Sequence, residues 1–261
     1  MYHFKIIAMS IKLFVSCLLL INVFSLAIAQ EVRIPDANFK KSLIAQGIDT
    51  NGDGKIQFSE AKSVKILYVN KAGITSLEGI KSFSNVEDLG FYENDIKDVD
   101  LSGMTNLKFI YGFDTHMESM NIKGCINVLN ISCHKNNLRE LDVSDQKKLI
   151  ELSLGFNQLT RLDISGLKDL KKVHAYLNQI QEFKFDNSPQ LEEIWINENR
   201  ISHHLDLTKF PNLKFFIAFK NPIQSVNIVG LEFLEDFSCH GSHINTLNLS
   251  GTKRLKEISW Y

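Results

Sequence analysis

The sequence predicts a solenoid, mainly β or α/β, in which about nine to ten successive turns contribute to one parallel sheet. The chain repeats with a period of 21 residues, apolar residues recur at the same places in each repeat, and an asparagine follows most predicted strands. One such unit cannot bury its own apolar side chains, so neighbouring units must stack into a continuous core. The composition, 44% hydrophobic and 23% charged over 261 residues, is that of a globular protein with a large core.

Residues 1–29 have the pattern of a secretory signal peptide. Lys5 and Lys12 precede an apolar run over 13–28 that leads into "AIA" at 27–29, with the small residues Ala27 and Ala29 at the −3 and −1 positions. A positively charged start, an apolar middle and small residues before the cleavage point are typical of a cleaved signal. We expect the mature chain to begin at Gln30 and to be secreted or periplasmic, with attachment to the cell surface left open.

Two alternatives to cleavage are less favoured. An uncleaved membrane anchor needs about 20 apolar residues, and this run is shorter. Lipid attachment at Cys17 is disfavoured because the apolar run continues well past it. We therefore expect no membrane span after cleavage. Loss of two lysines with the signal moves the formal charge from −1 to −3, which gives no reason to expect a nucleic-acid partner.

Residues 30–63 precede the repeats, and we expect them to form a helical cap. The segment "PDANFKKSLIAQG" at 35–47 predicts a helix with Phe39, Leu43 and Ile44 on one side. The next segment, "DTNGDGKIQFSE" at 49–60, is laid out like an EF-hand calcium loop, with oxygen donors at alternate positions and a glycine for the sharp turn. The predicted ligands are Asp49, Asn51, Asp53, Lys55 through its carbonyl, Gln57 and Glu60.

A calcium sensor is not the expected role of this loop. Sensors need two helices that open, commonly with paired loops, whereas this loop occurs once and only a short segment separates it from the first repeat strand at 65–69. A solenoid end exposes its core and needs a cap. We expect structural calcium that stiffens the cap; the alternative is a loop ordered by packing alone.

The repeats occupy residues 64–261. Within each unit, positions 1, 4, 6, 11, 14 and 16 are mostly apolar, and alternation over positions 4 to 6 is typical of a strand. Position 9 is usually asparagine, whose amide can turn inward and bond backbone groups where the strand ends. The units start at Val64, Val86, Leu107, Val128, Leu149, Leu170, Leu191, Leu213, Leu234 and Leu255, and asparagine stands at Asn94, Asn136, Asn157, Asn178, Asn199 and Asn221.

This pattern, "LxxLxLxxNxL", resembles the leucine-rich repeat. The 21-residue length with "LDVSD" at 141–145 and "LDISG" at 162–166 is similar to the secreted, internalin-like bacterial members. The asparagine column departs from the pattern at Thr115 and Ser242, and the first unit is degenerate. The resemblance implies a concave parallel sheet that recognises a protein, and the segment at 34–61 resembles the amino-terminal cap of some bacterial members.

Positions 3, 5 and 7 of each unit point outward from the predicted sheet and are unusually aromatic. A contiguous exposed apolar patch marks an interaction site, although aromatic residues also favour strands for their own sake. Between two aromatic groups, Ser153 and Gly155 predict a shallow depression. The predicted partner-binding residues are Tyr92, Phe109, Tyr111, Phe113, His134, His174, Tyr176, Trp195, Phe215, Phe219 and His240.

A protein is the expected ligand of this face. The alternative is a carbohydrate bound by Trp195, Tyr176 and the cluster from Phe109 to Phe113, since ring faces with polar edges suit both. We expect no enzyme, because no nucleophile motif occurs. Zinc is not expected either, because His240 and His243 lack accompanying ligands at zinc-site spacing.

The remaining features concern the thiols and the final strand. Cys133 and Cys239 occupy the same inward position five units apart, about 24 Å at the strand spacing, so with Cys125 they should be unpaired buried thiols. The sequence stops just after the tenth strand. Its free edge predicts pairing with a second molecule, or a lid made by Trp260 and Tyr261, or a truncated chain.

Overall fold

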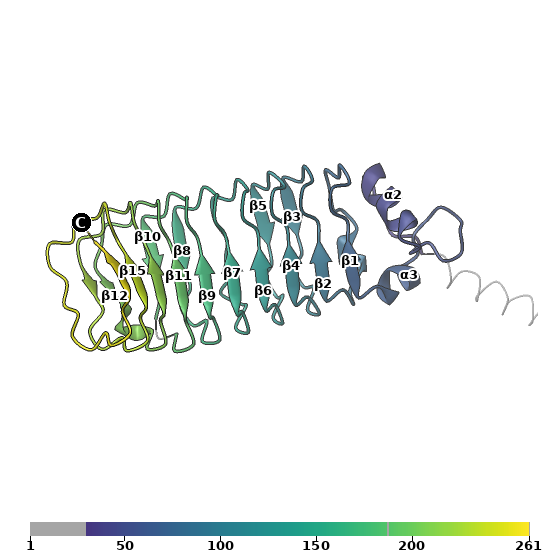
Figure 1. Ribbon diagram of the computed structural model, residues 1–261. Helices are drawn as coiled ribbons and strands as arrows, with labels where there is room; N and C mark the ends of the chain where they lie inside the picture. Colours follow the sequence, from purple (N-terminus) through teal and green to yellow (C-terminus); the bar gives the residue numbers. More distant parts are fainter. Residues whose placement is uncertain (1–29, 187, 261) are drawn as a thin grey trace, which may run out of the picture.

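The computed structural model describes residues 30–186 and 188–260, so the predicted signal peptide lies outside the described residues. The repeats form an elongated coil with a small helical cap at its amino-terminal end (Figure 1). One ten-stranded sheet runs along the coil, and three two-stranded sheets lie on other turns of the same units. This is the architecture of a leucine-rich repeat solenoid.

The ten-stranded sheet is parallel, and neighbouring strands are related by one repeat. Leu89 pairs with Ile110, which pairs with Ile131. The register therefore matches the 21-residue period. The strands in sheet order are β1 (Ile66–Tyr68), β2 (Asp88–Gly90), β4 (Phe109–Tyr111), β6 (Asn130–Ser132), β7 (Glu151–Ser153), β9 (Lys172–His174), β11 (Glu193–Trp195), β13 (Phe215–Ile217), β15 (Asp236–Ser238) and β16 (Glu257–Ser259).

The opposite, convex side has shorter pairings and turns closed by exposed side chains. The Asp142 carboxylate accepts the backbone N–H of Ser144 at 2.9 Å, and Asp163 does the same for Ser165 at 3.0 Å. Such local turns account for the aspartates of the repeated motif. The convex elements are β3 (Asp98–Asp100) with β5 (Ser119–Asn121), β8 (Arg161–Asp163) with β10 (Glu182–Lys184), β12 (Leu205–Asp206) with β14 (Val226–Asn227), and the 3₁₀ helices η1 (Ile80–Ser82) and η2 (Leu207–Lys209).

The core is a stack of apolar layers, one from each unit. The middle residue of every sheet strand from β1 to β15 is buried, while Ile258 in the last strand is 37% exposed. The Phe91 ring of the preceding turn fills the space that a side chain at Gly112 would occupy. A Cβ on Gly112 would lie only 2.4 Å from that ring. Cys125, Cys133 and Cys239 are free and buried, as expected.

The asparagines form a buried ladder that closes each turn after the sheet strand. The Asn157 amide nitrogen donates to the carbonyls of Cys133 and Leu154, both at 3.0 Å, and its oxygen accepts the N–H of Leu138 at 3.0 Å. Each such residue satisfies backbone groups of its own turn and of the preceding one. At Thr115 the hydroxyl donates to Asn136 of the next unit, which keeps the ladder continuous.

The cap consists of two helices, α2 (Ala37–Ala45) and α3 (Phe58–Ser63), on either side of the 49–60 loop. Phe39 and Leu43 are fully buried, whereas Ile44, expected on the same side of the helix, is 37% exposed. Ile44 directly follows Leu43 and therefore lies about 100° further around α2, away from the row of Phe39 and Leu43 that faces the core. Asp36 caps α2 through Phe39 N and also accepts the N–H groups of Thr75 and Ser76, which ties the cap to the first repeat.

Candidate binding site on the concave sheet

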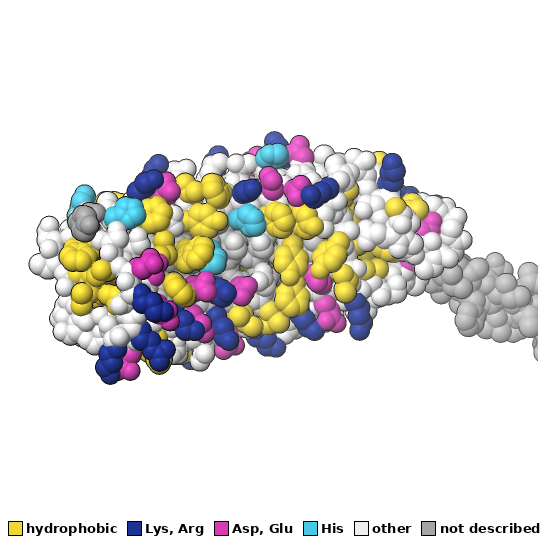
Figure 2. All heavy atoms as spheres, viewed as in Figure 1, with side chains coloured by type: hydrophobic (Ala, Val, Ile, Leu, Met, Phe, Trp, Pro, Cys, Tyr) yellow, Lys and Arg dark blue, Asp and Glu magenta, His cyan; other side chains and the backbone are white. Residues whose placement is uncertain are grey.

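The predicted binding residues share one open face of the ten-stranded sheet. Ten of the eleven are half-buried, and Trp195 is 37% exposed. Hydrophobic and histidine side chains accordingly gather over the sheet in Figure 2. The alternation of the strands explains this placement, because positions 3, 5 and 7 lie on the side away from the core.

One stack of rings crosses three neighbouring units near the amino-terminal half. Tyr92 and Phe113 lie with ring centroids 4.3 Å apart and planes within 9°, and Phe113 and His134 lie 4.7 Å apart within 6°. All three side chains are at position 7. The repeat distance between parallel strands brings such rings to stacking distance, so the stack is a direct product of the periodicity.

Positions 3 and 5 of the amino-terminal strands carry a second group of rings, which includes Tyr68, Phe109 and Tyr111. The Tyr68 hydroxyl donates to the Asp88 carboxylate at 2.6 Å, and this hydrogen bond raises the pKa of Tyr68 to about 12. The Tyr68 ring lies over Gly90, where a Cβ would be 2.5 Å from it. Phe109 and Tyr111 lie parallel on one strand with centroids 6.5 Å apart. These contacts hold the rings in place.

The carboxy-terminal half carries the second aromatic group. His174 and Trp195 stack at 4.3 Å, and Phe219 and His240 stack at 4.7 Å. The structure thus brings most of the predicted residues together in one stack of three rings and in separate pairs. Phe215 lies on the same face, in β13.

A depression of about 180 Å³ lies between the two groups. Tyr111 and His174 line its two ends, and Ser132 and Ser153 line the strands between them. The depression predicted beside Ser153 is therefore present. Gly155 is covered instead, because the Tyr176 ring lies 2.8 Å from where its Cβ would be.

Charged and amide side chains form the other part of this depression. Asn130, Glu151 and Lys172 line it, and sequence reasoning did not select them. The Lys172 ammonium lies 3.4 Å from Glu193 and 3.9 Å from Glu151, while Asn130 donates to Glu151 at 2.8 Å. The signal was available in the outward position 3, which turns polar in the units between Phe109 and Phe215.

Burial favours the neutral form of two of the half-buried histidines of this face, His134 and His174. Burial lowers the pKa of His134, and burial also lowers that of His174 despite the opposing hydrogen bond between its Nε2 and Glu193 at 3.2 Å. Both rings therefore present uncharged surfaces at neutral pH.

In the cap loop, several predicted calcium ligands converge. The Asn51 amide donates to Asp53 and to Gln57, each at 3.3 Å, and Gln57 donates to Asp53 at 2.9 Å. Asp49 accepts the N–H of Gly54 at 2.8 Å, and Gly54 has the positive φ of 75° that the sharp turn needs. The donor set is rich in oxygen, which suits a hard cation.

Glu60 is engaged within the loop as well. Its carboxylate accepts hydrogen bonds from the N–H and hydroxyl of Thr50 and from the N–H of Gln57. The Lys55 ammonium lies 3.2 Å from Glu31. Within residues 30–186 and 188–260, no three His, Cys, Asp or Glu side chains are grouped so as to hold a metal ion. Calcium binding stays a prediction.

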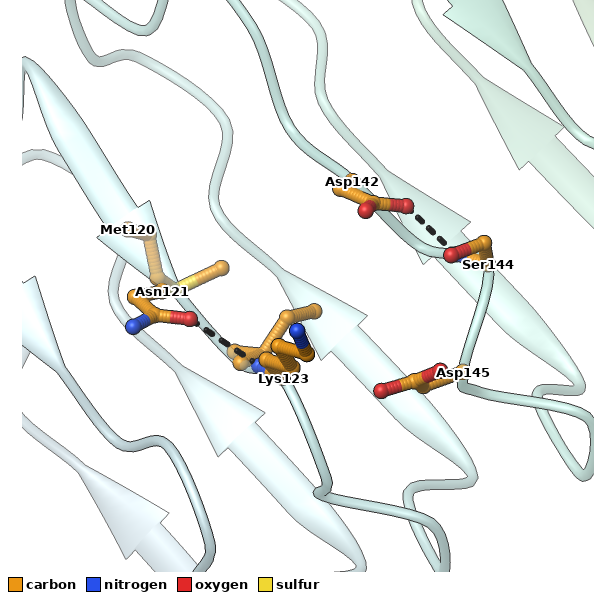
Figure 3. Close-up of a pocket in the computed structure, with 7 residues that line it drawn as sticks. Met120, Asn121, Lys123, Asp142, Ser144 and Asp145 are labelled. Atoms are coloured by element: carbon orange, nitrogen blue, oxygen red, sulfur yellow. Dashed lines mark hydrogen bonds between the residues drawn. The ribbon is translucent and has the colours of Figure 1, made fainter.

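A smaller depression of about 120 Å³ lies on the convex side, lined by Lys123, Asp142 and Asp145 among others (Figure 3). Its carboxylates already close turns: Asp142 accepts from Ser144, and Asp145 accepts the N–H of Gly124 at 2.9 Å. It is a by-product of the local turns.

Comparison with solved structures supports the fold. No protein-family model and no curated protein matches the chain. The functional domain of InlJ from Listeria monocytogenes is similar with a TM-score of 0.55 and 19% identity, over 87% of this chain and 59% of that domain. Internalin C2 of the same organism gives 0.58 and 18%, over 86% and 93%.

A leucine-rich repeat protein of Leptospira interrogans gives a TM-score of 0.51 at 18% identity, over 73% of this chain and 58% of its own. The chain thus spans less than two thirds of the length of two of these three neighbours. At such identities the likeness concerns the fold, which is that of an internalin-like leucine-rich repeat. Among the described residues, no helix is long and apolar enough to cross a membrane.

Proposed function

We propose that this protein is a secreted binding module that recognises a protein partner through its concave rings. The observation that carries the proposal is the stack of Tyr92, Phe113 and His134 on the open face of the sheet. Ordered rings offer large contact area at little entropic cost, and aromatic residues dominate the energetic centres of protein interfaces. The leucine-rich repeat fold and the signal pattern of residues 1–29 support the same role.

The test uses residues 30–261 as bait for proteins of the surrounding medium and of candidate host surfaces. Phe113→Ala removes the ring at the centre of the stack. Phe233→Ala is the matched control, because its ring lies outside the sheet strands, beside Arg254. We expect the wild type and the control to capture the same protein and Phe113→Ala to lose it. Equal capture by all three variants would contradict the proposal.

We also propose that the 49–60 loop holds calcium and thereby stiffens the cap. Asp49, Asn51, Asp53 and Gln57 with the Lys55 carbonyl and Glu60 would supply its oxygen ligands. The convergence of the side chains at 51, 53 and 57 supports this proposal. Ligand binding to the folded state alone raises stability by mass action, so the ion would tighten the contact between α2 and the first repeat.

Thermal unfolding with calcium and with a chelator tests the loop. We expect calcium to raise the melting temperature of the wild type and of Glu78→Gln, which changes an exposed glutamate paired with Arg33. Glu60→Gln should melt at the same temperature under both conditions. A wild-type melting temperature that calcium does not change would contradict this proposal and leave the proposal for the concave face unaffected.

A further inference from the structure

The depression between the aromatic groups has a distinct shape and floor. Ser132 and Ser153 occupy position 5 on β6 and β7, where the flanking strands carry Tyr111 and His174. Three strand spacings separate β4 from β9, or about 14 Å at the usual distance between strands. Two short side chains thus leave an open place between two ring-bearing walls.

The lining of this depression is polar but balanced in charge. It contains one carboxylate, Glu151, and one ammonium, that of Lys172, and these two lie 3.9 Å apart. Burial lowers the pKa of His174, so its ring adds no charge at neutral pH. An ion would find little net attraction here, whereas a neutral group with several hydroxyls would find both donors and acceptors.

Unused hydrogen-bonding capacity is present on the floor. The Ser153 hydroxyl makes no hydrogen bond to any residue that the structure describes, and the Ser132 hydroxyl has only the 3.3 Å contact with His134 Nδ1. The Asn130 amide is fixed by its bond to Glu151. These groups are already placed and need little reorganisation to bond a ligand.

The size of the depression suits a small ligand. Its volume is about 180 Å³. This is smaller than the cavities of about 300 Å³ or more that hold drug-sized molecules. A single six-membered ring with its substituents partly in solvent suits a space of this size.

We propose that this depression binds a single neutral pyranose ring of a sugar. The C–H face of the ring would pack against His174, and its hydroxyls would exchange hydrogen bonds with Ser132, Ser153 and Asn130. This goes beyond the proposed function because it needs no protein partner. The depression shares Tyr111 with the 109–113 cluster, but neither Trp195 nor Tyr176 lines it.

Trp195 supplies the readout. It stacks on His174 at 4.3 Å, so a ring seated against His174 should change its fluorescence. The chain has two tryptophans, and Trp260→Phe removes the other signal. In that background, methyl glycosides of glucose, galactose, mannose and N-acetylglucosamine are titrated separately to about 50 mM, because one ring of this size binds in the millimolar range.

Ser153→Leu fills the depression, and Ser238→Leu makes the same change at the same strand position of β15. We expect at least one glycoside to give a saturable change in the parent protein and in Ser238→Leu, and at least tenfold weaker binding in Ser153→Leu. Circular dichroism checks that both variants fold.

Two results would overturn the sugar site: no glycoside changes the emission, or Ser153→Leu binds as well as the parent. Loss of the captured protein in Ser153→Leu, with all glycosides silent, would mean that the depression takes a side chain of that protein, so the proposed function would stand and the sugar site would fall. With a saturable sugar signal and protein capture indifferent to Phe113→Ala, the sugar site would stand and the proposed function would fall.

Discussion

The two sides of the solenoid use the same 21-residue step in different ways. On the concave side most turns are closed from inside by a buried asparagine such as Asn157, and many outward positions carry rings. On the convex side the turns are closed from outside by carboxylates such as Asp142. Where the closing group is inside, the surface is free for recognition; where it is outside, structural contacts occupy the surface.

We expect the largest loss of stability when the inner closing group is removed. Asn157→Ala leaves the buried N–H of Leu138 without its partner. It also removes one of the two donors of the Cys133 and Leu154 carbonyls, which keep their bonds from Asn136 and Asn178. An unsatisfied buried N–H costs about 1 to 3 kcal/mol and each of the two lost bonds about 1 kcal/mol, so we expect a loss of about 3 to 5 kcal/mol. Urea unfolding measures it.

Asn106→Ala is the control for that experiment, because the exposed Asn106 amide donates to the Ser84 carbonyl at the surface. We expect it to change stability by under about 1 kcal/mol. Equal losses in the two variants would show that burial of the ladder is unimportant.

Phe113→Ala tests the concave surface itself. The ring loses stacking contacts with Tyr92 and His134, each worth about 0.5 to 1.5 kcal/mol, so stability should fall by about 1 to 2 kcal/mol. Partner affinity should fall more, by about 2 kcal/mol or roughly thirtyfold, if the stack is the centre of the interface. Unfolding curves and binding titrations on the same preparation separate the two effects.

Asp142→Ala tests the convex closure. The carboxylate bonds one exposed N–H, that of Ser144 (Figure 3), so water can replace it. We expect a loss of about 0.5 to 1 kcal/mol and unchanged partner binding. A change in partner binding as large as that of Phe113→Ala would place function on both sides and remove the distinction between them.

Acidification should slightly lower the free energy of unfolding through His134 on the concave side. Burial lowers the pKa of His134 in the folded state, so the unfolded chain takes up a proton first as the pH falls. Above the unfolded pKa of about 6.5, the neutral His134 ring makes its full contribution to stability. This contribution is lost as the pH falls from there through the lower pKa of His134 in the folded state. Melting temperatures at about pH 7.5 and about pH 5.5 should differ less in His134→Gln than in the wild type.

His204→Gln, which changes an exposed histidine bonded to Ser225, should keep the wild-type difference. A wild-type pH response that survives in His134→Gln would assign it to other groups.

Much of the architecture followed from the sequence because every unit must present its apolar positions to the same core. The ten sheet strands, the buried asparagines and the outward rings are all consequences of that requirement. Ile44 is more exposed than Phe39 and Leu43 because it lies about 100° around α2 from Leu43, away from the row that faces the core. Asn130, Glu151 and Lys172 were missed because only the aromatic and histidine members of the outward columns were selected, although position 3 is polar in most units.

The sequence by itself determined the period, the layer order of the core and the columns that face outward, since local alternation and stacking leave one solution. Tertiary structure decided which side chains meet. Asp36 reaches Thr75, Tyr176 covers Gly155, and Tyr111 faces His174 across two serines. Such contacts join residues one or more turns apart, and they depend on the rotamers that neighbouring units leave open, which no single repeat encodes.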